Sequence, residues 1–139
     1  MTCIAQGLAK NASLIKLNVS ENLFTVNSIS QLTTVLMKRA QEDKDDSKSC
    51  QLRELDLSHC ELDKKSIDAL STLLRSTYKL RILNLRDNMI HDEEGQSLFT
   101  SMLTNSYLTK LNMELNPIKH SLFREFETIT KQNALKVHD

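Results

Sequence analysis

One eleven-residue pattern, which occurs four times, constrains the fold of this chain more than any other feature of its sequence. The four stretches begin at Leu14, Leu52, Leu80 and Leu108, with spacings of 38, 28 and 28 residues. They read LIKLNVSENLF, LRELDLSHCEL, LRILNLRDNMI and LTKLNMELNPI. The first, fourth, sixth and eleventh residues are apolar, and the ninth is Asn or Cys. Repeats of this length stack side by side and bury a continuous core between neighbours, so the pattern predicts a solenoid.

Each repeat is predicted to contain a short strand followed by a helix. Within the pattern the apolar residues alternate, as in a strand with one buried face. The apolar residues that follow recur at helical spacing. The predicted helical faces are Ile29, Leu32, Val35 and Leu36; Ile67, Leu70, Leu73 and Leu74; Leu98 and Met102; and Phe123, Phe126 and Ile129. Right-handed crossovers between parallel strands place the helices on one side, so we predict an α/β solenoid with a parallel β-sheet on its concave face and α-helices on its convex face.

The whole chain, residues 1–139, is predicted to be a single repeat domain. Residues 1–13 are predicted to be a half repeat or cap, with Ile4 and Leu8 on one helical face. The units that follow are 14–51, which carries an insertion at 41–49, then 52–79, 80–107, and 108–139 as terminal repeat and tail. The first residues are equally consistent with a fragment of a longer protein and with a minimal cap.

Three places depart from the regular pattern. The insertion, QEDKDDSKS, is polar throughout and mostly charged; we favour a solvated loop or a helix extension over a docking segment. Gly95 occupies an apolar helical position, which predicts thin packing that Phe99 fills. Leu135 falls 27 residues after Leu108, so residues 133–139 resemble the approach to a fifth strand.

The ninth position of the pattern is predicted to be structural. Asn22, Asn88 and Asn116 occupy it, and Cys60 replaces asparagine once. A buried amide side chain behind the strand can satisfy the backbone groups of a turn that no regular ladder pairs. Thr25, Asp63 and Asp92 stand shortly afterwards, where N-caps of the helices are expected.

The period, the L-x-x-L-x-L-x-x-N/C-x-L segments and the helix after each strand resemble the ribonuclease-inhibitor-like class of leucine-rich repeat proteins. The resemblance extends over roughly residues 1–132. It implies a horseshoe-like solenoid that binds protein through its curved surface or rims. The class includes inhibitors, receptor sensor domains, a GTPase activator, an actin-filament cap and scaffolds. The alternating long and short repeats of the ribonuclease inhibitors are absent here.

Strand residues between the leucines are predicted to point outward from the concave face. Because equivalent residues of neighbouring strands stack about 4.8 Å apart, they form rows. The candidate partner-binding residues in these rows are Lys16, Glu54, Ile82 and Lys110; Asn18, Asp56, Asn84 and Asn112; Ser20, Ser58, Arg86 and Glu114; and His59 and Asp87 on the turn beyond. Lys16 with Glu54 and Arg86 with Glu114 are expected to form exposed ion pairs. An outward Asn84 is expected to tolerate alanine, and Ile82 is the apolar residue among polar neighbours that an interface centre favours.

The composition disfavours several other functions. Eighteen basic residues balance 18 acidic ones, so nucleic acid and acidic membrane surfaces are not expected as partners. Three cysteines without a C-x-x-C pair favour a reducing, cytoplasmic location, and no membrane span or signal pattern is present. We find no convergent catalytic residues, no metal-ligand set and no cofactor motif; Cys60 is expected to be a buried structural thiol.

The sequence therefore predicts a non-enzymatic protein-interaction or scaffold module whose partner is another protein. A regulator of an enzyme, such as a GTPase activator or inhibitor, is the first alternative. The second is an assembly fragment that associates through its open repeat ends, with another copy or with missing repeats.

Overall fold

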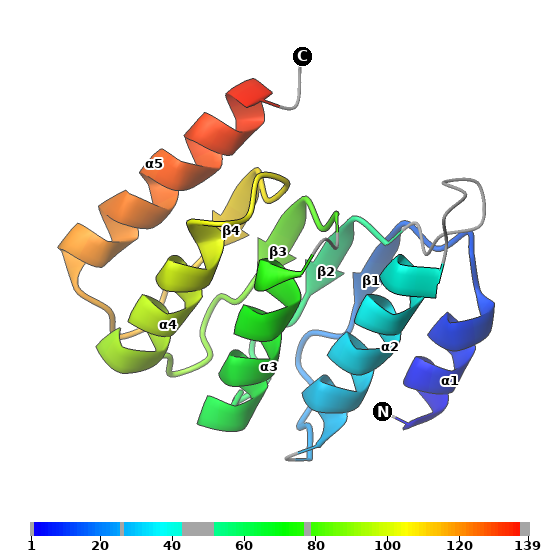
Figure 1. Ribbon diagram of the computed structural model, residues 1–139. Coiled ribbons are helices and arrows are strands. Elements are labelled where there is room, and N and C mark those ends of the chain that lie inside the picture. The colour runs from blue at the N-terminus through cyan, green and yellow to red at the C-terminus, as the bar shows by residue number, and fades with distance from the viewer. Residues whose placement is uncertain (1, 26, 43–51, 77–78, 137–139) are drawn as a thin grey trace.

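The computed structural model describes residues 2–25, 27–42, 52–76 and 79–136 of the chain. Its elements, in order, are α1 Thr2–Lys10, β1 Lys16–Asn18, α2 Ser28–Glu42, β2 Glu54–Asp56, α3 Lys64–Arg75, β3 Ile82–Asn84, α4 Asp92–Met102, β4 Lys110–Asn112 and α5 His120–Lys136. Each strand leads into a turn and then a helix that returns to the start of the next strand (Figure 1). The predicted α/β repeat architecture is confirmed.

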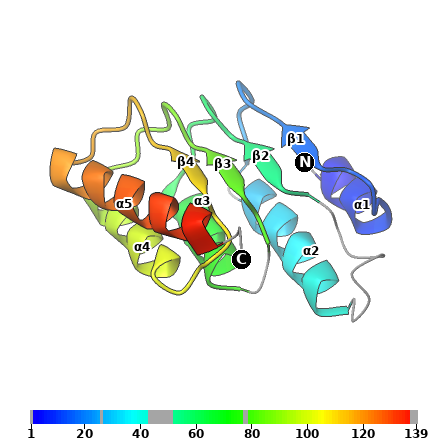
Figure 2. The same cartoon turned by 90° about the horizontal axis from the view of Figure 1, so that it is seen from above.

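The four strands form one parallel sheet in chain order, β1-β2-β3-β4. Lys16 pairs with Glu54, Glu54 with Ile82, and Ile82 with Lys110, so residues at equal repeat positions lie side by side. Helices cover one face of this sheet and leave the other uncovered (Figure 2). Strands stack more closely than helices, so the uncovered sheet face is the concave one.

The core lies between the sheet and the helices. Leu55, Leu57, Leu83 and Leu85 point inward from the two middle strands and are buried. The helical faces predicted from the sequence meet them there, with the second face, Ile67, Leu70, Leu73 and Leu74, buried in full. In the first face Val35 is half-buried, and in the last Phe123 and Ile129 are half-buried. None of the described helices is long and apolar enough to span a bilayer.

The two ends of the solenoid differ from the prediction. In α1, Ala5 and Leu8 face the core, whereas Ile4 is 37% exposed, so the inward face is rotated by one residue. At the other end no fifth strand begins within the described residues. Helix α5 continues to Lys136 and leaves Leu135 exposed, because Asn133 is buried within the helix and donates to the carbonyls of Asn105 and Leu108 at 2.9 and 3.0 Å.

The helix N-termini bear out only part of the predicted capping. Asp63 caps α3 by accepting from the amide of Ser66 at 2.8 Å. The Thr25 hydroxyl instead contacts the Ser28 hydroxyl, and its backbone carbonyl accepts from Ser28. Asp92 is the first residue of α4 rather than its cap, and its carboxylate accepts from the amide of Lys119 in the next repeat at 2.7 Å.

The insertion lies almost entirely outside the described residues. Helix α2 ends at Glu42, so it includes the first two residues of the predicted insertion. The remaining predicted insertion, residues 43–49, and Cys50 are not among the residues that the structure describes.

The packing at Gly95 is tight, which corrects the expectation of a thin site filled by Phe99. A Cβ placed on Gly95 would lie 2.9 Å from Leu122 Cδ2 and 3.2 Å from Ile118 Cγ2. The start of α5 and the turn before it therefore occupy the space that a larger residue would need. Phe99 packs instead edge to face against Phe126, with ring centroids 5.9 Å apart.

The two glycines of the chain should respond oppositely to alanine. Gly7 lies within α1 with nothing within 4 Å of its virtual Cβ, so Gly7→Ala should stabilise the fold by about 0.5–1 kcal/mol through helix propensity. Gly95→Ala gains the same propensity but must displace Leu122, so it should give no gain or a loss. Urea melts of both variants measure the difference. Equal stabilisation by both would show that the Gly95 site has room.

Candidate functional site

The residues predicted to bind a partner lie together on the concave face and at its rim. The strand pairings align Lys16, Glu54, Ile82 and Lys110 in one row and Asn18, Asp56, Asn84 and Asn112 in the next, as predicted. Ser58 is buried, whereas Lys16 and Lys110 are exposed and Ile82 is half-buried. The rows therefore form one continuous surface that crosses all four strands.

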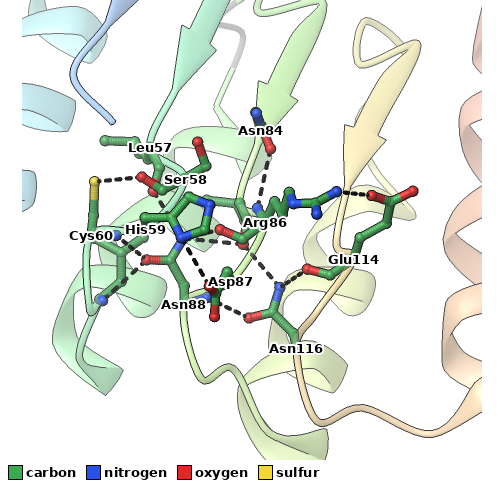
Figure 3. Close-up of polar contacts among 12 residues, drawn as sticks. Leu57, Ser58, His59, Cys60, Asn84, Arg86, Asp87, Asn88, Glu114 and Asn116 are labelled. Carbon is green, nitrogen blue, oxygen red and sulfur yellow. Dashed lines mark hydrogen bonds and ion pairs between the residues drawn. The ribbon is translucent and has the colours of Figure 1, made fainter. Parts of the chain in front are cut away.

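Ion pairs on this surface join neighbouring repeats. Lys16 Nζ lies 2.9 Å from Glu54 Oε2, and the Arg86 guanidinium binds the Glu114 carboxylate, so both predicted pairs are present. On the turns beyond the strands, His59 Nδ1 lies 2.8 Å from Asp87 Oδ2, a contact that is an ion pair only when the imidazole is protonated (Figure 3). Pairs this exposed contribute roughly 0–1 kcal/mol each, so their main effect is to neutralise charge locally.

The second row has a structural role, and Asp56, Asn84 and Asn112 in it are half-buried. The side-chain oxygens of Asn18, Asp56, Asn84 and Asn112 each accept from the backbone amide two residues later, at 2.9–3.1 Å. Each therefore closes the turn at the end of its own strand. Asn84 also donates to Asp56 Oδ2 at 3.0 Å. We therefore revise the expectation that Asn84→Ala is silent: the substitution removes the acceptor for Arg86 N and should cost about 0.5–1.5 kcal/mol.

Asp56 is the only acid in this row. Burial alone would raise the pKa of its carboxyl, but hydrogen bonds from the Ser58 hydroxyl and amide and from Asn84, with the nearby His59, hold the pKa below the ordinary value of 3.8. A lowered carboxyl pKa in the folded state means that the ionised form stabilises the fold. This stability is present above the pKa of the unfolded chain and is lost as the pH falls through the folded pKa.

Asp56→Asn should therefore reduce the acid sensitivity of the fold. The asparagine keeps an acceptor for Ser58 N but loses the bond from Asn84, so we expect a loss of about 0.5–1.5 kcal/mol at pH 7. Below about pH 4 the difference from the unmodified protein should shrink. Urea melts from neutral to acid pH measure it, with Glu125→Gln on the exposed side of α5 as control. An undiminished difference in acid would contradict the role given to the ionised carboxylate.

The turns at the rim hold non-glycine residues in a left-handed conformation. Glu21, His59, Asp87 and Leu115 occupy equal positions in the four repeats and have φ between 53° and 58°. Such a conformation costs roughly 1–2 kcal/mol for an L-residue. Backbone bonds between adjacent turns hold it in place, including His59 N to Arg86 O and Asp87 N to Glu114 O, both 3.0 Å. The rim side chains are thus presented on a fixed backbone.

A hollow of about 420 Å³ opens on the concave face beside β4. Its lining includes Ile82, Asn84, Lys110, Asn112, Phe123 and Glu127. Among the described residues no side chain pairs with the Lys110 ammonium or the Glu127 carboxylate. The sequence analysis assigned Phe123 to the core and did not single out Glu127. Their spacing of one helical turn in α5, which no further repeat covers within the described residues, is the signal that could have identified them.

The reactive side chains do not form a catalytic or metal site in the described part of the chain. Cys60 is buried; its thiol donates to the carbonyls of Ser58 and Val19 at 3.3 and 3.4 Å, and burial raises its pKa. His120 Nε2 accepts from Arg124 Nε at 3.0 Å. Within the described ranges no group of three His, Cys, Asp or Glu residues could hold a metal ion.

Comparison with known families and sequences identifies the repeat type. The leucine-rich repeat family models match residues 51–73 and residues 79–99. The mouse (Mus musculus) NACHT, LRR and PYD domains-containing protein 4B is 34% identical over 89 residues, which are 63% of this chain. The chain spans 10% of the length of that relative.

Two solved structures share the fold across nearly the whole chain. Leiomodin-1 actin-binding site 2 superposes with a TM-score of 0.70 at 15% identity, covering 96% of this chain and 89% of that one. The Caenorhabditis elegans tropomodulin C-terminal domain superposes with a TM-score of 0.57 at 12% identity, covering 99% and 95%. At these identities the likeness establishes the fold alone.

Proposed function

Because this chain is a leucine-rich repeat protein, we propose that it is a non-enzymatic interaction module that binds a partner protein through its concave face. The ribonuclease-inhibitor-like subclass remains a prediction. The cytoplasm is the proposed location, on the basis of the cysteine pattern. Actin binding is a property of the leiomodin-1 site and is not carried over to this chain.

The observation that carries the proposal is the contrast between the two lysines at the ends of the first row, Lys16 and Lys110. Over β1 and β2, Lys16 and Glu54 neutralise each other. Over β3 and β4, the half-buried Ile82 borders a hollow that Lys110 and Glu127 flank without pairing to described side chains. An apolar centre with charges at its edge is the arrangement that protein interfaces favour, since the centre loses water and the charges orient the partner. We place the centre of the interface at Ile82 and Lys110.

Two lysines in the same row provide the test. Lys16 and Lys110 are both exposed and occupy equal repeat positions, but only Lys110 borders the hollow. A photo-crosslinking residue placed at position 110 should capture a specific protein from cell extract, and the same residue at position 16 should capture it more weakly. Ile82→Asp should abolish capture at position 110 while leaving the melting temperature nearly unchanged. A crosslinker at Gln96, exposed on α4, is the convex-side control.

Equal capture from positions 110 and 96 would contradict the concave-face proposal. A regulator of an enzyme, the first alternative, would place the unpaired Lys110 ammonium against an acidic active site. It would then change that enzyme's turnover when purified with it, and Lys110→Ala would remove the effect.

Assembly through the ends is the second alternative. Among the described residues no strand lies outside β1 or β4, so both edges of the sheet offer backbone groups to a further strand. At the C-terminal end α5 covers part of this edge through the buried Phe126 and Asn133. The N-terminal end is the more open of the two.

A further inference from the structure

The hollow beside β4 exposes apolar side chains on both of its walls. Leu111 of β4 is half-buried, whereas its counterparts Leu55 and Leu83 in β2 and β3 are buried. Phe123 of α5 is half-buried as well, and it lines the hollow together with Leu111. The volume of about 420 Å³ lies within the range of about 300–1,000 Å³ that is usual for ligand pockets. The hollow therefore offers apolar surface that a partner can cover.

Two side chains of opposite charge stand on the opposite walls. Lys110 belongs to β4 and Glu127 to α5, and both are exposed. Glu114, the third charged residue of the lining, is bound by Arg86. Neither the Lys110 ammonium nor the Glu127 carboxylate pairs with a side chain in the described part of the chain. Because charges across an interface must be complementary, the hollow favours a partner that is acidic beside β4 and basic beside α5.

The two walls run in opposite directions and have similar lengths. Helix α5 returns beside β4, so its C-terminal part lies near the start of that strand (Figure 1). The bond from Asn133 Nδ2 to Leu108 O, at 3.0 Å, fixes this alignment. Residues 110–114 of the lining extend about 13 Å in strand geometry, and residues 123–130 extend about 10 Å in helical geometry. The hollow is thus about as long as two turns of a helix.

A helix presents its side chains in the arrangement that such a hollow requires. The apolar residues of an amphipathic helix, at positions i, i+4 and i+7, form one stripe about two turns long. Residues on either side of the stripe point toward the two walls of a groove that holds the helix. In an extended segment successive side chains alternate between two faces. Such a segment would turn one line of side chains into the hollow and the other line away from both charges.

We propose that the hollow beside β4 is a groove for one amphipathic helix of the partner protein. The apolar stripe of this helix covers Leu111 and Phe123, its acidic flank faces Lys110, and its basic flank faces Glu127. The inference rests on the proposed function, because it specifies the partner for the same hollow. It goes further in one respect, since the charges on the two flanks of the bound helix are set by positions 110 and 127.

A library of helices tests this dependence on two positions. The probe is a phage-displayed library of single helices, randomised in the stripe and on both flanks, and selected on the full chain. Helices enriched on the unmodified chain should carry Asp or Glu on one flank and Lys or Arg on the other. On Lys110→Glu the acidic flank should become basic, and on Glu127→Lys the basic flank should become acidic. In each case the other flank should keep its charge.

Binding of one enriched helix provides the quantitative readout. It should bind Lys110→Glu and Glu127→Lys at least about tenfold more weakly than the unmodified chain, because like charges then face each other. The matched controls are Lys65→Glu, exposed on α3, and Glu125→Lys, on the side of α5 that faces α4. Both controls should bind the helix like the unmodified chain. All four substituted residues are exposed, so the melting temperatures should stay nearly unchanged.

Flank charges that do not follow positions 110 and 127, or reversals that leave binding unchanged, would overturn the proposal. Failure to enrich any helix would also overturn it, and binders from a parallel library of proline-containing peptides would then identify an extended occupant. The crosslinking experiment separates these results from the proposed function. Capture from position 110 and not from position 96 upholds the concave face even where the helix fails. Equal capture from both positions, with flanks that switch as expected, supports the helix groove and contradicts the proposed function.

Discussion

Leu83→Ala should destabilise the fold by roughly 2–5 kcal/mol, the range for deleting a fully buried leucine side chain. Leu83 is 0% exposed in β3, between two neighbouring strands, and contributes to the same core as Leu55 and Leu85. In a solenoid each repeat packs only against its neighbours, so the cavity left by Leu83→Ala lies in the core that adjacent repeats share. The loss should therefore appear in both adjacent repeats as one cooperative change in a denaturant melt.

The adjacent residue and the end repeat provide the controls for Leu83→Ala. Ile82→Ala removes an outward, half-buried side chain and should cost less than about 1 kcal/mol. Leu17→Ala, at the same position in the half-covered first repeat, should cost an intermediate amount. Because successive strand residues point to opposite faces, comparable losses for Ile82→Ala and Leu83→Ala would show that the inward and outward assignment is wrong.

The regular part of this fold could be predicted from the sequence because its physics is local and periodic. A spacing of 28 residues sets equivalent residues side by side, so the leucine pattern specified both the inward faces and the strand register, such as Glu54 beside Ile82. The charged pairs Lys16–Glu54 and Arg86–Glu114 followed from this register alone. The repeat spacing therefore identifies which residues lie side by side wherever a neighbouring repeat is present.

Periodicity predicts less for the first and last repeats, which have a described neighbour on one side only. Leu135 matches the spacing of a strand leucine, but the buried Asn133 finds its acceptors from within a continuous helix, so Leu135 turns to solvent. Asn22 matches the pattern fully and was expected to be buried, yet it is exposed, because no turn packs ahead of it in the described part of the chain. The error at Gly95 has another cause, since Leu122 and Ile118 of the next repeat fill the space beside it.

Only part of the candidate site could be predicted from the sequence. The rows of outward residues were predictable, whereas the turn-closing role of Asn84 depends on the backbone two residues on. The hollow beside β4 depends on where α5 lies, and the repeat spacing does not determine the position of the last helix. The proposed centre of the interface therefore lies beside β4, where the shape of the surface depends on α5.

The asparagine row supplies the second large effect, because Asn88 joins two turns through buried bonds. Its Oδ1 accepts from Cys60 N and Leu62 N, and its Nδ2 donates to the carbonyls of Leu57 and Leu85 at 2.8 and 3.1 Å (Figure 3). The side chain is 1% exposed, so water cannot replace these partners. Asn88→Ala should therefore cost about 2–4 kcal/mol, more than an ordinary hydrogen bond contributes, because several buried backbone groups are left without partners.

The chain contains its own controls for this prediction. Asn22→Ala removes the same side chain from an exposed turn without a preceding repeat and should cost less than about 1 kcal/mol, and Asn116→Ala, half-buried, should fall between the two. Asn88→Cys copies the residue found at position 60, where the thiol donates to two carbonyls but is a weak acceptor, so it should recover only part of the loss. Equal losses at positions 22 and 88 in urea melts would mean that the bonds within each turn, rather than those between turns, hold the repeats together.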